Sequence, residues 1–277
     1  EYPMATLITG HRSYGSLIGV TIHEAIHSWY QMLLGTNESK YAWMDEGFTT
    51  YASGYVESTI AGQPNRQRGA LRGYYAIATS SKAEPMTVHS DHYKTNRAYS
   101  LNAYSKGATT LVQLSYIIGE EKFLAAMRDY YYTWRYKHPN PTDFKRIMEK
   151  SSGLELDWFF EHWVGSLNTI DYGIKGMEPD GDGSAVVLER VNALPMPLEV
   201  MVVYKDGSKA IHYIPLRIMR GEKGNEYPDV AWEVEEDWPW VYPEYRLKLD
   251  RPMSEVEQVV LDPSARMADI EPANNSY

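Results

Sequence analysis

The stretch "VTIHEAIHSWYQ", residues 20–31, decides how this chain is interpreted. His23 and His27 are four residues apart, and helical residues at that spacing lie nearly above one another on one face. Both imidazoles can therefore reach a single metal ion. Glu24 is rotated by about 100° around the helix from His23, so it is placed to act on a water at that ion rather than as a ligand. The stretch thus shows the H-E-x-x-H pattern of zinc sites, with two ligands and a general base.

A helix that carries two histidines by chance is the alternative interpretation, because the pattern is short. The residues around it are uncharged or bulky: Thr21, Ile22, Ala25, Ile26 and Trp29. We therefore expect a buried helix, in which two histidines and a glutamate are costly without partners, and a metal ion supplies such partners. The other histidines stand alone in the sequence and are expected on the surface or satisfied by ordinary contacts: His11, His89, His92, His138, His162 and His212.

A catalytic zinc site needs a third protein ligand. The chain has no cysteine, so this ligand must be His, Asp or Glu, and disulfides are excluded. Asp45 and Glu46, in "WMDEGFTTYA", are the next candidates, and Glu46 follows His27 after 18 residues, positions 28–45. A helix that returns antiparallel would bring Glu46 back to the histidines. The alternative is that the two acids only complement the N-terminus of their own helix.

Composition limits the other function classes. The chain has 277 residues and a formal net charge of -10, which argues against nucleic-acid binding driven by phosphate neutralisation. No apolar run reaches the length of about 18–20 residues that a membrane span needs. The compartment stays open, because the composition fits a cytoplasmic protein as well as a periplasmic or exported bacterial one. The sequence starts without Met, and any signal peptide would lie upstream of this segment.

The hydrophobic pattern changes near Asn168, from helical spacing to strand-like runs. We expect helices over 13–34, 45–61, 70–79, 103–118, 120–136, 141–152 and 156–164. We expect strands over 185–191, 198–204, 210–218, 245–250 and 256–262, with a hairpin at Asp206–Gly207. The predicted fold is multidomain: a mostly helical domain over 1–167, truncated at its N-terminus, followed by a small antiparallel β-sandwich over 168–277. Residues 233–240, "EVEEDWPW", are expected to form an exposed loop whose tryptophans dock on the helical domain.

At this point the sequence resembles a known family. "HEAIH", 18 intervening residues and the Glu of "WMDEGFTTYA" resemble the signature of the aminopeptidase N family of gluzincin zinc metallopeptidases. The resemblance implies one zinc ion held by His23, His27 and Glu46. It also implies that Glu24 is the general base and that the helical domain is a thermolysin-like (gluzincin) catalytic domain. The strand-rich remainder is similar to the β-sandwich that follows this domain in the family.

Two further segments extend the resemblance. "AYSLNAYSKGATTLVQLSYIIGEEKF", residues 98–123, resembles the family segment whose tyrosine, here Tyr104, hydrogen-bonds the oxyanion; Tyr99 matches a second tyrosine near the site. "EYPM" at the start resembles the end of the Gly-x-Met-Glu-Asn motif, which implies that Glu1 binds the free amino terminus of a peptide substrate. Tyr2 departs from that motif, which has Asn at this position.

The resemblance implies an aminopeptidase that hydrolyses the first peptide bond of a peptide with a free N-terminus. It also implies that an N-terminal β-domain of the same polypeptide is missing, so that the segment alone is inactive. Three alternatives stay open: a gluzincin endopeptidase, a non-catalytic zinc-binding or interaction protein derived from the family, and an additional epoxide-hydrolase activity. The preferred N-terminal residue and the oligomeric state are not predicted.

Overall fold

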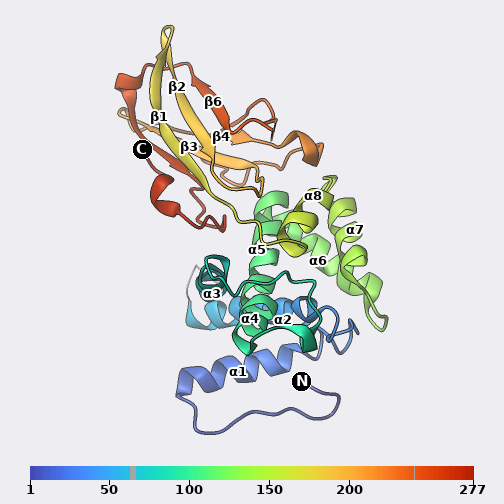
Figure 1. Ribbon diagram of the computed structural model, residues 1–277. Helices are drawn as coiled ribbons and strands as arrows, with labels where there is room; N and C mark the ends of the chain where they lie inside the picture. Colours follow the sequence, from blue (N-terminus) through green and yellow to red (C-terminus); the bar gives the residue numbers. More distant parts are fainter. Residues whose placement is uncertain (63–66, 240) are drawn as a thin grey trace.

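The computed structural model describes residues 1–62, 67–239 and 241–277. Helices make up the first part of the chain and strands the second, and the two kinds of element lie at opposite ends of the molecule (Figure 1). The α-helices are α1 (Tyr14–Ile26), α2 (Ala42–Ala61), α3 (Arg68–Ala78), α4 (Asn96–Ser100), α5 (Gly107–Ile118), α6 (Glu120–Trp134), α7 (Pro141–Ser152) and α8 (Asp157–Phe159). Two π-helical segments, η2 (Leu101–Lys106) and η3 (Phe160–Val164), continue α4 and α8. No helix of the described ranges is long and apolar enough to span a bilayer.

The centre of the helical region is α5, in which every residue is buried. It packs on α2 at an unusually close approach, because a Cβ atom added to Gly47 would lie 2.6 Å from the Cα atom of Gly107. Only glycine permits two helix backbones to touch in this way. Glu46 precedes one of these glycines and Tyr104 lies just before the other. The contact therefore holds Glu46 and Tyr104 beside each other.

The first helix differs from its prediction in length and in burial. It ends at Ile26, not near residue 34, because the chain turns away and pairs with another segment: the Tyr136 N–H donates to the Leu33 carbonyl at 2.6 Å. The predicted burial is also wrong, because Thr21 and Ala25 are exposed. Helix α1 lies at the edge of the molecule and packs on α2 (Figure 1).

Among the described residues, seven strands form two sheets beyond the helices. One sheet has the order β1 (Tyr172–Asp180), β2 (Gly183–Arg190), β6 (Glu244–Leu249), and the other has the order β5 (Ala231–Val234), β4 (Lys209–Ile214), β3 (Leu198–Tyr204), β7 (Val256–Leu261). The hairpin predicted at Asp206–Gly207 joins β3 to β4, and Gly207 has the positive φ, 85°, that the turn requires.

The predicted all-antiparallel arrangement is wrong for one pair of strands, because β5 runs parallel to β4. A long connection, residues 215–230, allows the chain to re-enter in the same direction. Strands β1 and β5 were not predicted.

Trp238 does not dock on the helices, contrary to the prediction from the sequence. Its ring packs instead on Tyr172 and Tyr245, at 5.6 and 5.3 Å between centroids. Trp240 lies outside the described residues.

A network of buried and half-buried charges fixes the strands against α5. Lys223 is buried; its Nζ pairs with Glu199 of β3, donates to the Tyr116 carbonyl of α5 at 2.8 Å and pairs with Glu226 at 2.8 Å. Arg266 also pairs with Glu226, at 2.5 Å. We call Lys223, Arg266, Glu199 and Glu226 the junction network.

Candidate metal centre

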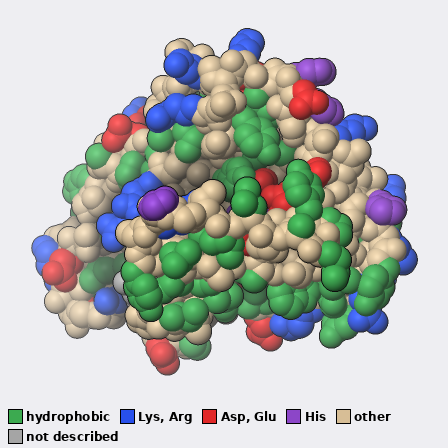
Figure 2. Space-filling view, turned by 90° about the horizontal axis from the view of Figure 1, so that it is seen from below, with side chains coloured by type: hydrophobic (Ala, Val, Ile, Leu, Met, Phe, Trp, Pro, Cys, Tyr) green, Lys and Arg blue, Asp and Glu red, His purple; other side chains and the backbone are tan. Residues whose placement is uncertain are grey.

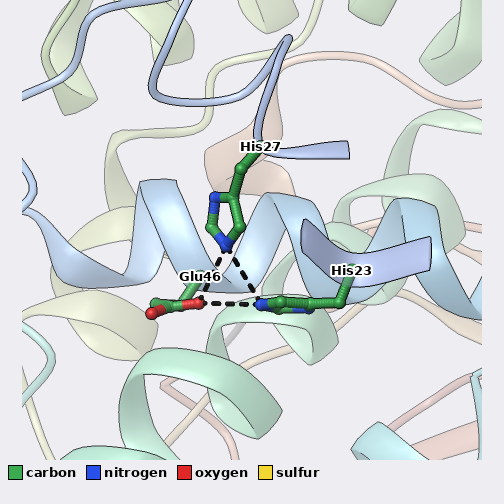
Figure 3. A group of neighbouring side chains, drawn as sticks. All are labelled: His23, His27 and Glu46. Carbon is green, nitrogen blue, oxygen red and sulfur yellow. Dashed lines mark hydrogen bonds and ion pairs between the residues drawn. The ribbon is translucent and has the colours of Figure 1, made fainter. Parts of the chain in front are cut away.

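The three residues predicted to bind metal lie together at the contact between α1 and α2. The Nε2 atoms of His23 and His27 are 3.1 Å apart, and the Glu46 Oε2 atom lies 3.1 Å from the first and 3.4 Å from the second. His23 comes from α1, His27 caps that helix, and Glu46 comes from the first turns of α2; their polar atoms point toward one another (Figure 3). These three residues, the α1–α2 cluster, could together hold one metal ion.

His27 is held from its other side by residues of α2. Its Nδ1 atom lies 3.0 Å from Asp45 Oδ1 and 3.3 Å from Thr49 Oγ1, and both of these side chains are buried. A carboxylate behind a histidine fixes the ring orientation and directs the opposite nitrogen toward a metal. Burial alone would lower the pKa of His27, but Asp45 and Glu46 outweigh it and raise this pKa to about 10. The two carboxylates therefore favour the protonated, positively charged form of the His27 ring.

Glu46 is stabilised as a carboxylate. Burial opposes its ionisation, but hydrogen bonds with His23, His27 and Tyr104 prevail and lower its pKa to about 2. Tyr104 donates from its hydroxyl to Glu46 Oε1 at 2.5 Å. Burial and the Glu46 charge raise the pKa of Tyr104 well above its ordinary range, so this hydroxyl stays protonated and can donate. Tyr99 stands behind it, edge-on to the Tyr104 ring at 6.4 Å between centroids.

Glu24 and Glu1 complete the acidic surroundings of the cluster. The α-amino group of Glu1 lies 3.1 Å from Glu24 Oε2, and the Glu1 side chain approaches His27 Nε2 at 3.7 Å. Burial, together with the charges of Glu46 and Asp45, raises the pKa of Glu1 to about 7. The structure therefore brings all the predicted site residues into one region, with Tyr99 at its border.

A cleft of about 450 Å³ runs from this region between α1, α2 and the start of α3. His23, Glu24 and Tyr104 line one part of it, and Ser53, Gly54 and Glu57 line another. Its size lies within the range of ligand pockets, which starts at about 300 Å³.

Asp45 was considered from the sequence only as a ligand or as a complement to the helix N-terminus. The sequence did not predict the contacts that Asp45 and Thr49 make with the His27 ring. Two features of the sequence could have indicated these contacts. Asp45 is adjacent to the predicted ligand Glu46, and residues 45 and 49 are one helical turn apart, on the face of α2 that meets His27.

Comparison with known proteins places the chain in a family. Residues 6–163 match the peptidase family M1 domain. Leucine aminopeptidase 2-1 of Meyerozyma guilliermondii is 29% identical over 197 residues, which cover 65% of this chain and 30% of that protein. Leukotriene A-4 hydrolase of Xenopus laevis is 26% identical over 175 residues, covering 60% of this chain and 27% of that protein. The chain thus spans less than a third of the length of these curated relatives.

The fold is also that of a solved relative. Aminopeptidase A of Legionella pneumophila, solved in complex with aspartic acid, superimposes with a TM-score of 0.61 over 91% of this chain and 26% of its own, at 16% sequence identity. The chain belongs to peptidase family M1, the family that the sequence signature predicted. It is a mixed helical and sheet structure of the kind found in that family.

Proposed function

We propose that this chain carries the active site of a zinc-dependent aminopeptidase, which hydrolyses the first peptide bond of peptides. The observation that carries the proposal is the α1–α2 cluster, with Asp45 behind one histidine and Glu24 beside the other. Membership of family M1 and the similarity to leucine aminopeptidases support the same activity.

The residues fit a zinc ion in number, kind and spacing. Ligand atoms at about 2.0–2.1 Å in a tetrahedron lie roughly 3.3 Å from one another. The three ligand atoms of the cluster are separated by 3.1, 3.1 and 3.4 Å. Two neutral imidazoles and one carboxylate leave the fourth position for water, as catalytic zinc sites require. We assign one zinc ion to this cluster.

When bound, zinc supplies a water whose pKa is lowered to about 7 and polarises the scissile carbonyl. Glu24 accepts the proton of the attacking water and delivers it to the leaving amine. Tyr104 exchanges its hydrogen bond to Glu46 for one to the oxyanion that develops on the carbonyl oxygen. Asp45 holds the His27 ring in position throughout.

Glu1 is assigned to the α-ammonium group of the substrate. The Glu1 carboxylate lies 3.7 Å from His27 Nε2 and within 4.8 Å of the Glu24 carboxylate, so it can bind an ammonium group next to the catalytic residues. A substrate amine held there limits cleavage to the first peptide bond. An endopeptidase would need this space for the part of the peptide upstream of the scissile bond. We therefore rank an endopeptidase second, behind the aminopeptidase.

We further assign residues 1–167 to a thermolysin-like catalytic domain and residues 168–277 to a separate β-domain.

The lower face of the molecule carries many exposed hydrophobic side chains (Figure 2). The exposed hydrophobic residues of the segment that leads into and out of α1 include Met4, Leu7 and Tyr14, and Trp29, which is 48% exposed. A face of this kind usually packs against another part of a protein. In our proposal it meets a further domain of a longer polypeptide, consistent with the share of the relatives that this chain spans.

The test is made on the complete natural polypeptide. A panel of aminoacyl chromogenic substrates is compared with the same peptides blocked at the N-terminus, with and without a zinc chelator. The proposal expects turnover of free substrates only, abolished by the chelator and restored by zinc. Equal turnover of blocked peptides would favour the endopeptidase, and zinc-loaded protein without any peptidase activity would favour a non-catalytic role.

A further inference from the structure

A second group of metal-binding side chains lies at the edge of the four-stranded sheet, far along the chain from the α1–α2 cluster. His212 belongs to β4, Glu233 to the edge strand β5, and Glu235 follows β5 directly. We call these three residues the β4–β5 cluster. The sequence alone gave His212 no role beyond an ordinary satisfied histidine.

The backbone explains why the three side chains meet. His212 and Glu233 are direct partners in the parallel register, so their side chains leave the sheet on the same face. Glu235 lies two residues beyond Glu233, which places it on that face as well. Its position is fixed, because its N–H donates to the Tyr213 carbonyl at 2.9 Å. On the opposite face Tyr213 and Trp232 stack at 5.2 Å between centroids, which secures the register.

The possible ligand atoms of the β4–β5 cluster lie close enough together to reach one ion. His212 Nδ1 lies 2.7 Å from Glu235 Oε1 and 3.5 Å from Glu233 Oε2, and the three atoms fall within 4.8 Å of one another. These values bracket the separation of roughly 3.3 Å expected between the ligands of a tetrahedral ion. His212 is only 3% exposed, so its ring is held by the sheet and is not free to turn away.

The charge at this place is unbalanced. Within the described ranges, His212 is the only basic side chain that pairs with either carboxylate, and no lysine or arginine does. Two carboxylates and a neutral imidazole leave two negative charges, which a divalent cation neutralises. This ligand set, one nitrogen and two carboxylate oxygens, suits zinc and related first-row transition metals.

We propose that the β4–β5 cluster binds a divalent transition-metal ion such as zinc, independently of the α1–α2 cluster. The ion joins the exposed edge strand β5 to the buried strand β4. Because anything that binds only the folded state stabilises it, this ion raises the melting temperature of the protein. The proposal does not depend on peptidase activity, since the site is built from other elements.

The experiment uses Zn²⁺ alone as the probe. Zinc bound per chain is measured by elemental analysis and by calorimetric titration for His23→Ala/His27→Ala, which empties the first cluster, and for the same protein with His212→Asn added. The double variant is expected to retain about one ion per chain and to melt at a higher temperature with zinc. Adding His212→Asn is expected to abolish both effects.

Two further variants keep the test decisive. Adding His89→Asn instead removes an exposed histidine beside Asp91, at 3.8 Å, and is expected to leave the zinc content unchanged. If the double variant does not fold, Glu233→Gln/Glu235→Gln in the otherwise unaltered complete polypeptide is expected to lower bound zinc from about two ions to about one, with peptidase activity retained. No zinc in the folded double variant, or the same zinc content after His212→Asn, would overturn the proposal.

Discussion

The buried charges between α5 and the strands differ from those between α1 and α2 in what neutralises them. In the junction network, Lys223 and Arg266 face Glu199 and Glu226, so acids and bases balance within the chain. Around the α1–α2 cluster, by contrast, no lysine or arginine of the described residues pairs with Glu24, Asp45 or Glu46.

The contrast separates a structural role from a functional one. A balanced buried network holds two parts of a molecule together and needs nothing from outside. An acidic cluster without a lysine or arginine partner is costly to bury until cations arrive. In our account those cations are zinc and the substrate's ammonium group. Each of the following changes alters one side of this comparison.

The largest effect is expected for Glu24→Gln. The amide cannot accept a proton, so turnover by the complete polypeptide should fall by about 10²–10⁴-fold while zinc content stays the same. Glu57→Gln, in the same cleft, is the matched control and should change turnover little. Retained turnover in Glu24→Gln would remove the general base from our mechanism.

The next largest loss of activity is expected for Tyr104→Phe. It removes the one hydroxyl that donates to Glu46, at 2.5 Å, and that we assign to the oxyanion. The expected loss in kcat is about 10²–10³-fold, with zinc affinity and KM nearly unchanged. Tyr93→Phe, whose ring packs on Tyr99 one step further from the cluster, serves as the control. A change confined to KM would mean that Tyr104 only binds substrate.

Asp45→Ala should weaken zinc binding by about 10–100-fold, because His27 loses the carboxylate 3.0 Å behind its ring. Asp45→Asn keeps an oxygen that can accept from Nδ1 and should lose less. Competition with a chelator of known affinity measures both variants. Equal affinity in Asp45→Ala and the unaltered protein would show that Thr49 and the α1 backbone suffice to place the ring.

These residues also show which parts of the site and the fold can be predicted from the sequence. The spacing of His23, His27 and Glu46 predicted their meeting, because a helix repeat and an antiparallel return are local rules. The early end of α1 could not be predicted, since the hydrophobic pattern continues beyond it, whereas Gln31 has a positive φ of 83° and Leu33 pairs with Tyr136, far along the chain. The burial of α1 was overestimated for a related reason: a pattern of apolar residues predicts a face but not its partner.

The strands, too, could be predicted only where the local sequence pattern is clear. Those with clear apolar runs were found, whereas β1 contains Gly173, Gly176 and Pro179, and β5 has only four residues, mostly exposed. The parallel pairing of β5 with β4 depends on the path of a long loop. The β4–β5 cluster depends on that pairing, so it could not be read from spacing.

The smallest effect concerns the balanced network. Burial alone would raise the pKa of Glu226, but Arg266 and Lys223 prevail and lower it from 4.5 to about 2. A lowered carboxyl pKa contributes stability that is complete above the unfolded value and is lost as pH falls through about 2. Glu226→Gln should therefore cost on the order of 2 kcal/mol of unfolding free energy at pH 7 and flatten the acid limb between pH 4.5 and 2.

Denaturant titrations across this pH range measure the effect. Glu244→Gln, which breaks the exposed pair with Lys175, is the control and should leave stability nearly unchanged. A Glu226→Gln protein with unaltered stability and acid limb would show that the junction network does not hold the two regions together.

The most direct test of the central claim is the zinc content of His23→Ala against that of the unaltered protein and of Glu24→Gln. All three are purified, exposed to the same zinc concentration and analysed for metal per chain. Our account predicts that His23→Ala loses about one ion per chain and its peptidase activity, whereas Glu24→Gln keeps the ion and loses only activity. Full zinc content and full activity in His23→Ala would contradict it.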